Sequence, residues 1–275
     1  MNHIVITKSE AERILNAEGS EVYVSLDLGI SSSKIDVSNG IADIIGQKIP
    51  IKEFEAVKEK ACYAVEDNQL KRVAFFSEET NLFYKLLPTK DWPTITLSST
   101  PMHRFTFVSP KKDTESKIKE ISPMKGNVLD TCCGLGYTAI MASKDADKVF
   151  TFERDQNVLR IAEYNPYSQQ LFSNKKIKIS EKNIFPEIKK FKSSFFSRVI
   201  HDPPTFKHSP ELYSREFHAE LFRVLKKDGI LYHYCSSPQI TKGRLLYPRI
   251  ARQLKEAGFH GIEYHGSSSG IRALK

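Results

Sequence analysis

The sequence predicts an α/β protein in which a mostly parallel, doubly wound sheet follows a small β-rich domain. Three observations support this prediction. Short β-branched segments alternate with helical segments after residue 126, which is typical of a parallel sheet. A Gly-x-Gly turn follows the first of these strands and opens a helix. The first 98 residues instead contain mostly strand patterns. We therefore expect a β-rich domain over residues 1–98 and an α/β domain over residues 99–275.

The N-terminal segment begins with one expected helix and continues with strands. Ser9 is a candidate helix cap with Glu12 as its reciprocal partner. Polar and apolar residues then alternate in four segments that predict strands, with the last two forming a hairpin: 21–28, 34–37, 72–76 and 81–85. The prolines between residues 88 and 110 indicate a linker.

The α/β domain begins with the stretch Val128-Leu-Asp-Thr-Cys-Cys-Gly-Leu-Gly-Tyr-Thr-Ala139. Its apolar start predicts a strand that ends at Asp130, and a helix is expected from about Tyr137. Gly134 and Gly136 allow a sharp turn and a close approach of the backbone to a ligand. The N-H groups that open the helix would point at the same site. This arrangement predicts a nucleotide-cofactor loop.

The next expected strand, residues 148–152, ends at Glu153, which lies 17 residues past Gly136. An acidic side chain at this position can bind a ribose diol. The turn also fits the looser dinucleotide pattern, so NAD has to be weighed against S-adenosylmethionine. Asp130 favours S-adenosylmethionine, because a carboxylate there suits a cationic amino-acid group and would repel a pyrophosphate.

Two more strands are expected at 176–179 and 197–200, and each is followed by polar residues. Asn183 comes shortly after the first, and His201-Asp-Pro-Pro-Thr-Phe206 follows the second. Two prolines end a strand and fix a rigid turn at the carboxyl edge of the sheet, where open α/β folds bind ligands. Helical spacing continues over 211–225 and 246–257, with strands expected at 230–234 and between 259 and 274.

Together these motifs resemble the Rossmann-like (class I) S-adenosylmethionine-dependent methyltransferases. Their order, with Glu211-Leu-Tyr-Ser-Arg-Glu-Phe217, resembles a family of archaeal methyltransferases that carry a β-rich N-terminal domain. The resemblance implies S-adenosyl-L-methionine as the cofactor. The residues that it places at the cofactor are Asp130, Cys132, Gly134, Gly136, Tyr137, Thr138, Glu153, Arg154, Asn183 and Asp202. The residues that it places at the catalytic centre are Asp202, Pro203, Pro204 and Phe206.

The Asp-Pro-Pro turn indicates the substrate class. It resembles the (Asp/Asn)-Pro-Pro-aromatic signature of methyltransferases that act on amino nitrogens of nucleobases, although Thr205 separates the prolines from Phe206. The Asp-Pro-Pro-x-Phe form also resembles ribosomal-RNA methyltransferases that act on ring atoms. An exocyclic amine is a poor nucleophile because its lone pair is conjugated with the ring. Asp202 would accept its hydrogens, and Phe206 would stack on the base.

The distribution of charge favours a polyanionic substrate. Residues 1–98 contain 11 Lys and Arg against 15 Asp and Glu, a balance of -4 (11 - 15), while residues 99–275 contain 30 against 18, or +12 (30 - 18). Basic residues that contribute to this excess include Lys175, Lys176, Lys178, Lys242 and Arg244. We expect RNA to bind over the α/β domain, with cytidine N4 in ribosomal RNA as the implied target. The same excess argues against a polyamine substrate.

Three alternatives remain open at this point. Tyr234-Cys-Ser-Ser-Pro238 looks like the motif of RNA cytosine-C5 methyltransferases, in which a cysteine attacks the ring, although a buried structural Cys235 is the better interpretation. A small-molecule methyltransferase or aminopropyltransferase would share the fold. An RNA-binding subunit with a degenerate methyltransferase fold would be no enzyme at all.

Composition narrows the class of protein further. No run of 18 apolar residues and no signal-peptide pattern is present, so we expect a cytoplasmic protein without membrane contact. The four cysteines have neither the paired spacing of a zinc site nor the density of a disulfide framework. No metal is therefore expected, and the sequence leaves the oligomeric state open.

Overall fold

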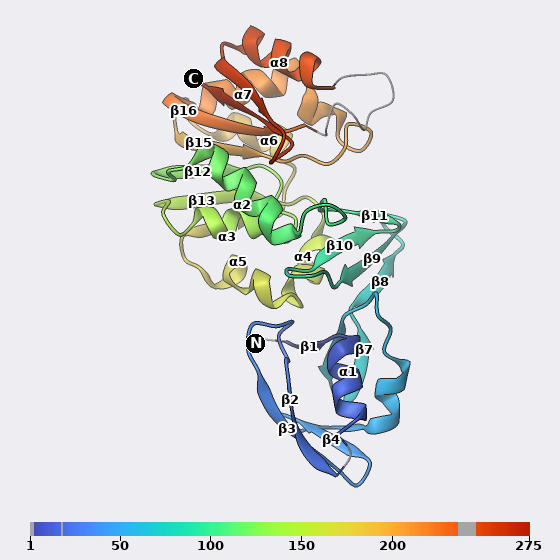
Figure 1. Ribbon diagram of the computed structural model, residues 1–275. Helices are drawn as coiled ribbons and strands as arrows, with labels where there is room; N and C mark the ends of the chain where they lie inside the picture. The colour runs from blue at the N-terminus through green and yellow to red at the C-terminus, as the bar shows by residue number, and fades with distance from the viewer. Residues whose placement is uncertain (1–2, 18, 236–245) are drawn as a thin grey trace. The chain divides into compact units, whose positions relative to one another are not determined.

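The computed structural model describes residues 3–17, 19–235 and 246–275 (Figure 1). The chain divides into two compact units. The N-terminal unit comprises residues 1–110 and 157–169, and the C-terminal unit comprises residues 111–156 and 170–275. The units differ from the predicted domains in two respects. The boundary between them falls after Pro110 rather than after residue 98, and residues 157–169 belong to the N-terminal unit. Residues 236–238 of the cysteine motif, with Lys242 and Arg244, lie outside the described residues.

The N-terminal unit is built from small antiparallel sheets, as the alternating pattern predicts. Within its described residues the strand orders are β1-β6-β7, β2-β3-β4-β5 and β11-β10-β9-β8. Its elements are β1 (Ile4–Ile6), α1 (Lys8–Leu15), β2 (Ser20–Val24), β3 (Ser33–Ser38), β4 (Ile41–Ile44), β5 (Gln47–Pro50), η1 (Ile51–Ala56), β6 (Tyr63–Glu66), β7 (Gln69–Arg72), β8 (Ala74–Ser77), β9 (Leu82–Leu87), β10 (Thr94–Leu97), β11 (Thr100–Pro101), most of α4 (Gln156–Glu163) and η2 (Pro166–Ser168).

Two local predictions for this unit are wrong. Helix α1 is capped by Thr7 rather than Ser9, because the Glu10 carboxylate accepts a hydrogen bond from the Thr7 backbone N-H at 3.1 Å. This capping box starts two residues earlier than the predicted one and satisfies the same kind of orphan N-H groups. The expected linker between residues 88 and 110 contains β10 and β11, which extend the β8-β9 hairpin into a four-stranded sheet.

The C-terminal unit is a seven-stranded sheet with helices packed against it, so the predicted α/β fold is confirmed. Figure 1 shows α7 and α8 beside one another near the C-terminus. Its elements are α2 (Pro110–Ile121), β12 (Asn127–Asp130), α3 (Tyr137–Ala142), β13 (Lys148–Phe152), α5 (Gln169–Ser173), β14 (Ile177–Ser180), α6 (Ile184–Glu187), η3 (Ile188–Lys190), β15 (Phe196–His201), η4 (Pro210–Tyr213), α7 (Arg215–Val224), β16 (Leu225–Tyr234), α8 (Leu246–Ala257), β17 (His260–His265) and β18 (Gly270–Leu274).

The strand order is β14-β13-β12-β15-β16-β18-β17, in which β12 to β16 are parallel and β18 runs antiparallel to its neighbours. Chain order reverses between β12 and β15, which makes this pair the topological switch point of the sheet. Ligands of open α/β sheets bind outside the carboxyl ends of the strands at such a point. Asp130 ends β12, and Asp202 follows β15 directly. The topology therefore brings the glycine turn and the Asp-Pro-Pro turn to one edge.

Candidate active site

The glycine turn packs so closely that side chains are excluded from it. Gly136 has a φ of 78° and stands at the N-terminus of α3, where the left-handed backbone favours glycine. A Cβ atom added there would lie 2.6 Å from the Leu171 Cδ2 atom of α5. Gly134 also has a positive φ, 54°. The turn therefore folds as predicted, and its packing against Leu171 depends on the absence of a side chain at Gly136.

Asp130 lies beneath this turn and is fully buried. Its carboxylate accepts hydrogen bonds from the Thr151 hydroxyl at 2.7 Å and the Thr138 hydroxyl at 3.3 Å. Burial raises the pKa of Asp130 to about 7, and the two hydroxyl donors oppose that rise. The side chain thus joins β12, β13 and α3, which is a structural role that the sequence did not reveal. Its contact with a cationic amino-acid group stays a prediction.

Glu153 approaches the glycine turn from the end of β13. One carboxylate oxygen accepts from the Gly134 N-H at 3.0 Å, and the other accepts from the Asp155 N-H at 3.0 Å. Burial raises the pKa of Glu153, while these backbone donors lower it. A half-buried carboxylate fixed at this edge has further lone pairs for the hydroxyl groups of a ribose. The chemistry of this donor set fits the predicted cofactor.

The other expected cofactor residues have identifiable partners in the protein. Asn183 caps α6, since its side-chain oxygen accepts from the Phe185 N-H at 3.0 Å. Arg154 is directed toward the segment after β15, where it donates to the His208 carbonyl at 3.0 Å and lies 3.3 Å from Glu211. Tyr137 is buried in α3. None of these contacts tests cofactor binding, so these assignments stay predictions.

The Asp-Pro-Pro turn is fixed by a hydrogen bond from Tyr213 and is followed by the exposed ring of Phe206. The Tyr213 hydroxyl donates to the Pro204 carbonyl at 2.8 Å, while Pro203 is buried. The Phe206 ring is 40% exposed and meets Tyr213 edge-to-face, with 5.7 Å between the ring centroids. The Arg249 guanidinium lies 4.9 Å from the centre of the Phe206 ring. Phe206 is therefore not a core residue, and a planar group can still reach part of its surface.

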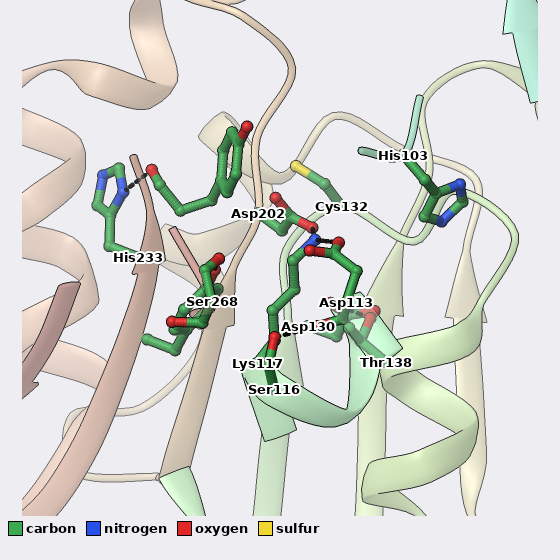
Figure 2. Close-up of polar contacts among 12 residues, drawn as sticks. His103, Asp113, Ser116, Lys117, Asp130, Cys132, Thr138, Asp202, His233 and Ser268 are labelled. Atoms are coloured by element: carbon green, nitrogen blue, oxygen red, sulfur yellow. Dashed lines mark hydrogen bonds and ion pairs between the residues drawn. The ribbon is translucent and has the colours of Figure 1, made fainter. Parts of the chain in front are cut away.

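Lys117 of α2 is a site residue that sequence reasoning missed. Its ammonium lies 2.6 Å from the Asp202 Oδ2 atom and 2.7 Å from the Asp113 Oδ2 atom (Figure 2). The side chains of Lys117 and Asp113 are 6% and 0% exposed. Burial alone would lower the pKa of Lys117, but the carboxylates, Asp202 above all, outweigh burial and raise it. The three residues therefore form a charged triad with a fixed ammonium at its centre.

The signal for this triad in the sequence was weak. Asp113 and Lys117 are four residues apart on one helix, a spacing that is common on solvated helix faces. Nothing local links them to Asp202, which lies 85 residues further along the chain. Only the fold of the C-terminal unit brings the third member to the pair.

Three buried histidines lie beneath the Asp-Pro-Pro turn. His201 contacts the Thr131 hydroxyl at 2.8 Å through Nδ1 and the Leu212 carbonyl at 3.0 Å through Nε2. Because a carbonyl can only accept, Nε2 carries the proton of the neutral ring and Nδ1 accepts from Thr131. His218 and His233 contact each other at 3.1 Å through their Nε2 atoms. Burial lowers the pKa of each ring, to about 3 for His218 and about 4 for His233.

The cysteines near the site are poor nucleophiles in this fold. Burial raises the pKa of the Cys235 thiol to about 12. Cys132 is half-buried beside Asp202 in Figure 2, and burial together with the charge of Glu153 raises its pKa well above the usual value. A thiolate is the reactive form of cysteine. These environments favour the structural interpretation of Cys235.

Among the described residues the structure contains neither a membrane-spanning helix nor a group of side chains that could bind a metal. None of the helices in the described part of the chain combines the length and the hydrophobicity needed to cross a membrane. Within residues 3–17, 19–235 and 246–275, no group of three or more His, Cys, Asp or Glu side chains is arranged to hold a metal ion.

The sheet, the glycine turn and the acidic strand ends together define a methyltransferase-type α/β domain. Residues 112–245 match the family model of the methyltransferase small domain. This match implies S-adenosylmethionine as the cofactor. The chain is also 38% identical over 288 aligned positions to uncharacterized protein MJ1233 of Methanocaldococcus jannaschii, covering all of this chain and 96% of that protein. The two proteins therefore belong to one family.

Solved structures with a similar fold include spermidine synthases. A spermidine synthase in complex with the transition-state analogue AdoDATO is 16% identical, with a TM-score of 0.57 over 73% of this chain and 71% of that chain. Spermidine synthase from Thermotoga maritima is 17% identical, with a TM-score of 0.56 over 73% of this chain and 70% of that one. At this level of identity the likeness concerns the fold alone.

Proposed function

We propose that the protein is an S-adenosylmethionine-dependent methyltransferase that modifies an exocyclic amino group of a base in RNA, with cytidine N4 as the preferred target. The observation that carries this proposal is the position of Asp202. It follows β15 at the switch point, is held by the Lys117 ammonium, and is followed by the exposed ring of Phe206. A fixed acceptor beside a stacking surface is what methylation of a planar amine requires.

The cofactor-binding residues fit the group that the family implies. Glu153 presents a fixed carboxylate to ribose hydroxyls, and the Gly134 N-H holds that carboxylate in place. Gly136 lets the same turn pack tightly against Leu171. When bound, S-adenosylmethionine supplies an electrophilic methyl group. The task of the protein is then to place a weak nucleophile opposite that methyl and to exclude other orientations.

Asp202 performs the orienting step in this proposal. Its carboxylate accepts a hydrogen bond from the N-H of the amine, which turns the nitrogen lone pair away from the protein and toward the methyl group. Methyl transfer would leave positive charge on the nitrogen, and the Asp202 carboxylate would stabilise that charge and accept the N-H proton that is released. Lys117 holds the carboxylate in one rotamer because it is fixed between Asp202 and Asp113.

Phe206 and Arg249 support a base as the substrate. Stacking of a base on an aromatic ring contributes on the order of 1–3 kcal/mol and tolerates any base. The cation beside the ring suits a neighbouring phosphate. The excess of +12 in residues 99–275, 30 Lys and Arg against 18 Asp and Glu, agrees with this substrate class.

An aminopropyltransferase is the second candidate because of the likeness in fold. Its cationic polyamine substrate would require carboxylates that lack a protein partner. Lys117 already occupies Asp113 and Asp202, and the basic character of the unit would repel a polyamine. These observations favour the RNA substrate.

The role of Asp202 can be tested by comparing the full-length wild-type protein with Asp202→Asn. Methyl transfer from labelled S-adenosylmethionine to unmodified ribosomal RNA is measured beside binding of S-adenosylhomocysteine. We expect transfer to fall at least a hundredfold, with cofactor affinity within about threefold of wild type. Transfer at the wild-type rate would remove Asp202 from the mechanism.

A further inference from the structure

The β8-β9 hairpin of the N-terminal unit exposes two aromatic side chains on one face. Phe76 and Phe83 stand directly opposite each other across the hairpin and are 55% and 36% exposed. Side chains at opposed positions of an antiparallel pair lie on the same face, about 5 Å apart at Cβ. Two exposed neighbouring phenylalanines form a continuous apolar surface rather than scattered surface residues.

The opposite face of this hairpin is covered. Phe75 and Tyr84, the next opposed pair, stack with 5.4 Å between their centroids. The Arg160 guanidinium of α4, in the same unit, lies 4.5 Å from the centre of the Phe75 ring. The exposed part of the other face is limited to the end that carries Phe76 and Phe83, because Leu87 and Thr96 on that face are buried.

A group of cations adjoins the exposed pair. Lys85 follows Phe83 by two residues and so shares its face. Arg72 lies two residues before Ala74, which stands opposite Lys85 in the hairpin. Burial and the nearby charges of Arg72 and Lys60 lower the pKa of Lys85. Among the described residues, no carboxylate forms a salt bridge with any of the three. Like charges that are left together without carboxylate partners provide a local site for an anion.

We propose that this face, formed by Phe76, Phe83 and Lys85 with Arg72 near its end, binds single-stranded RNA. Unpaired bases would stack on the two rings while phosphates approach the cations, a combination that is typical of sheets that bind single strands. The inference rests on the proposed function only in that RNA is the substrate. It assigns the N-terminal unit a role that the charge of -4 over residues 1–98, from 11 basic and 15 acidic residues (11 - 15), conceals.

The charges also indicate which end of the hairpin the RNA phosphates approach. Glu78 and Glu79 occupy the turn of the hairpin, beyond Phe76, whereas Lys85 and Arg72 are at its other end. Phosphates are repelled at the turn and attracted at the other end. A second copy of the chain is a poorer occupant, because pairing of identical faces would bring the cations of both copies together.

Fluorescence anisotropy with labelled RNA tests the proposal in the full-length protein. The probes are a single-stranded oligonucleotide of about ten nucleotides and the duplex of the same sequence, since stacking requires unpaired bases. We expect Phe76→Ala/Phe83→Ala to weaken binding of the single strand at least tenfold and to leave duplex binding nearly unchanged. Tyr23→Ala is the matched control, because Tyr23 is an exposed aromatic residue on another sheet of the same unit.

Charge variants provide a second readout if the aromatic variant does not fold. Lys85→Gln/Arg72→Gln should weaken binding and reduce its dependence on salt, whereas Glu78→Gln/Glu79→Gln should strengthen binding. Unchanged affinity in the aromatic and the cationic variants would overturn the proposal. A wild-type protein that does not bind the single strand, or an aromatic variant that changes only the oligomeric state, would also overturn it.

The outcomes separate this surface from the proposed function. If wild-type protein methylates RNA and the variants bind it normally, only the surface assignment fails. If the variants lose binding as expected but wild-type protein transfers no methyl group to RNA, the surface stands and the proposed reaction fails.

Discussion

The Lys117 ammonium lies 2.6 Å from the Asp202 carboxylate and joins helix α2 to the turn after β15. This contact places a buried cation beside the residue that the proposed reaction depends on. An ammonium at this distance holds the Asp202 carboxylate in one orientation. The second carboxylate, Asp113, holds the ammonium from the opposite side at 2.7 Å.

Replacing Lys117 by Met should leave two carboxylates close together without their cation. We expect a loss of about 3–5 kcal/mol in the free energy of unfolding, the usual result of removing one partner of a buried ion pair. Methyl transfer should fall at least a hundredfold, because Asp202 loses the contact that fixes its orientation. Chemical denaturation and methyl-transfer assays measure the two effects.

Lys119→Met is the control for this variant, since Lys119 is exposed on the same helix. The double variant Lys117→Met/Asp113→Asn should recover part of the stability but little of the activity. A Lys117→Met enzyme that transfers methyl groups at the wild-type rate would show that the ion pair has no role in orienting Asp202.

Replacing Gly136 by Ala should damage the cofactor turn in two ways. The left-handed backbone costs alanine about 1–2 kcal/mol, and contact with the Leu171 side chain at 2.6 Å adds about 1–3 kcal/mol. Gly40→Ala is the matched comparison, because Gly40 has a φ of 73° but no atom within 4 Å of an added Cβ. Gly136→Ala should be the less stable variant and should alone lose affinity for S-adenosylhomocysteine. Equal behaviour of the two variants would contradict the packing argument.

Replacing Glu153 by Gln should weaken cofactor binding about tenfold, since hydrogen bonds to charged acceptors contribute about 1.5–3 kcal/mol. The amide retains one acceptor oxygen, so the Gly134 N-H can keep its partner. Calorimetric titration with S-adenosylhomocysteine measures the change, with Glu115→Gln on the exposed face of α2 as the control. Unchanged affinity would place the ribose elsewhere.

The buried histidines predict a loss of stability in mild acid. Their folded pKa values are lowered, to about 3 for His218 and about 4 for His233, while an unfolded histidine titrates near 6.5. From about pH 6.5 down to about pH 4 the unfolded state therefore binds more protons. The free energy of unfolding should decrease by up to about 1.4 kcal/mol per pH unit for each histidine.

Asp130 opposes this trend in the same range. Burial raises its folded pKa to about 7, so below pH 7 the folded state binds the extra proton. Because three histidines act against one aspartate, the free energy of unfolding should still be higher at neutral pH than in mild acid. In denaturation series between pH 7 and 5, His218→Gln should have a shallower slope than wild type, whereas His260→Gln, at an exposed position, should not. A flat wild-type profile would contradict the account.

The parallel strands of the C-terminal unit could be predicted from the sequence because short segments with β-branched and aromatic residues alternate with helical segments. The segment from Lys148 to Phe152 is β13, and β15 includes the predicted segment 197–200. Residues 157–169 could not be assigned, because they join the N-terminal unit through contacts between distant residues. In one of these contacts the Tyr167 hydroxyl donates to the Leu28 carbonyl at 3.1 Å.

The candidate site was predictable where it is local in sequence and not where it depends on tertiary structure. The glycine turn, Glu153 and the Asp-Pro-Pro turn are short motifs, and the backbone conformation or the charge that each residue type provides can be argued from the sequence. The partners of Asp130 are Thr138 and Thr151, which come from a helix and another strand. Lys117 likewise reaches Asp202 only after the chain has folded.

The most direct test of the central claim locates the transferred methyl group. Full-length protein is incubated with labelled S-adenosylmethionine and unmodified ribosomal RNA, and the RNA is digested to nucleosides for mass spectrometry. We predict label on the N4 atom of cytidine, lost in Asp202→Asn and retained in Cys235→Ser. Label on cytosine C5 that disappears in Cys235→Ser, or no label on RNA from a protein that still binds the cofactor, would contradict it.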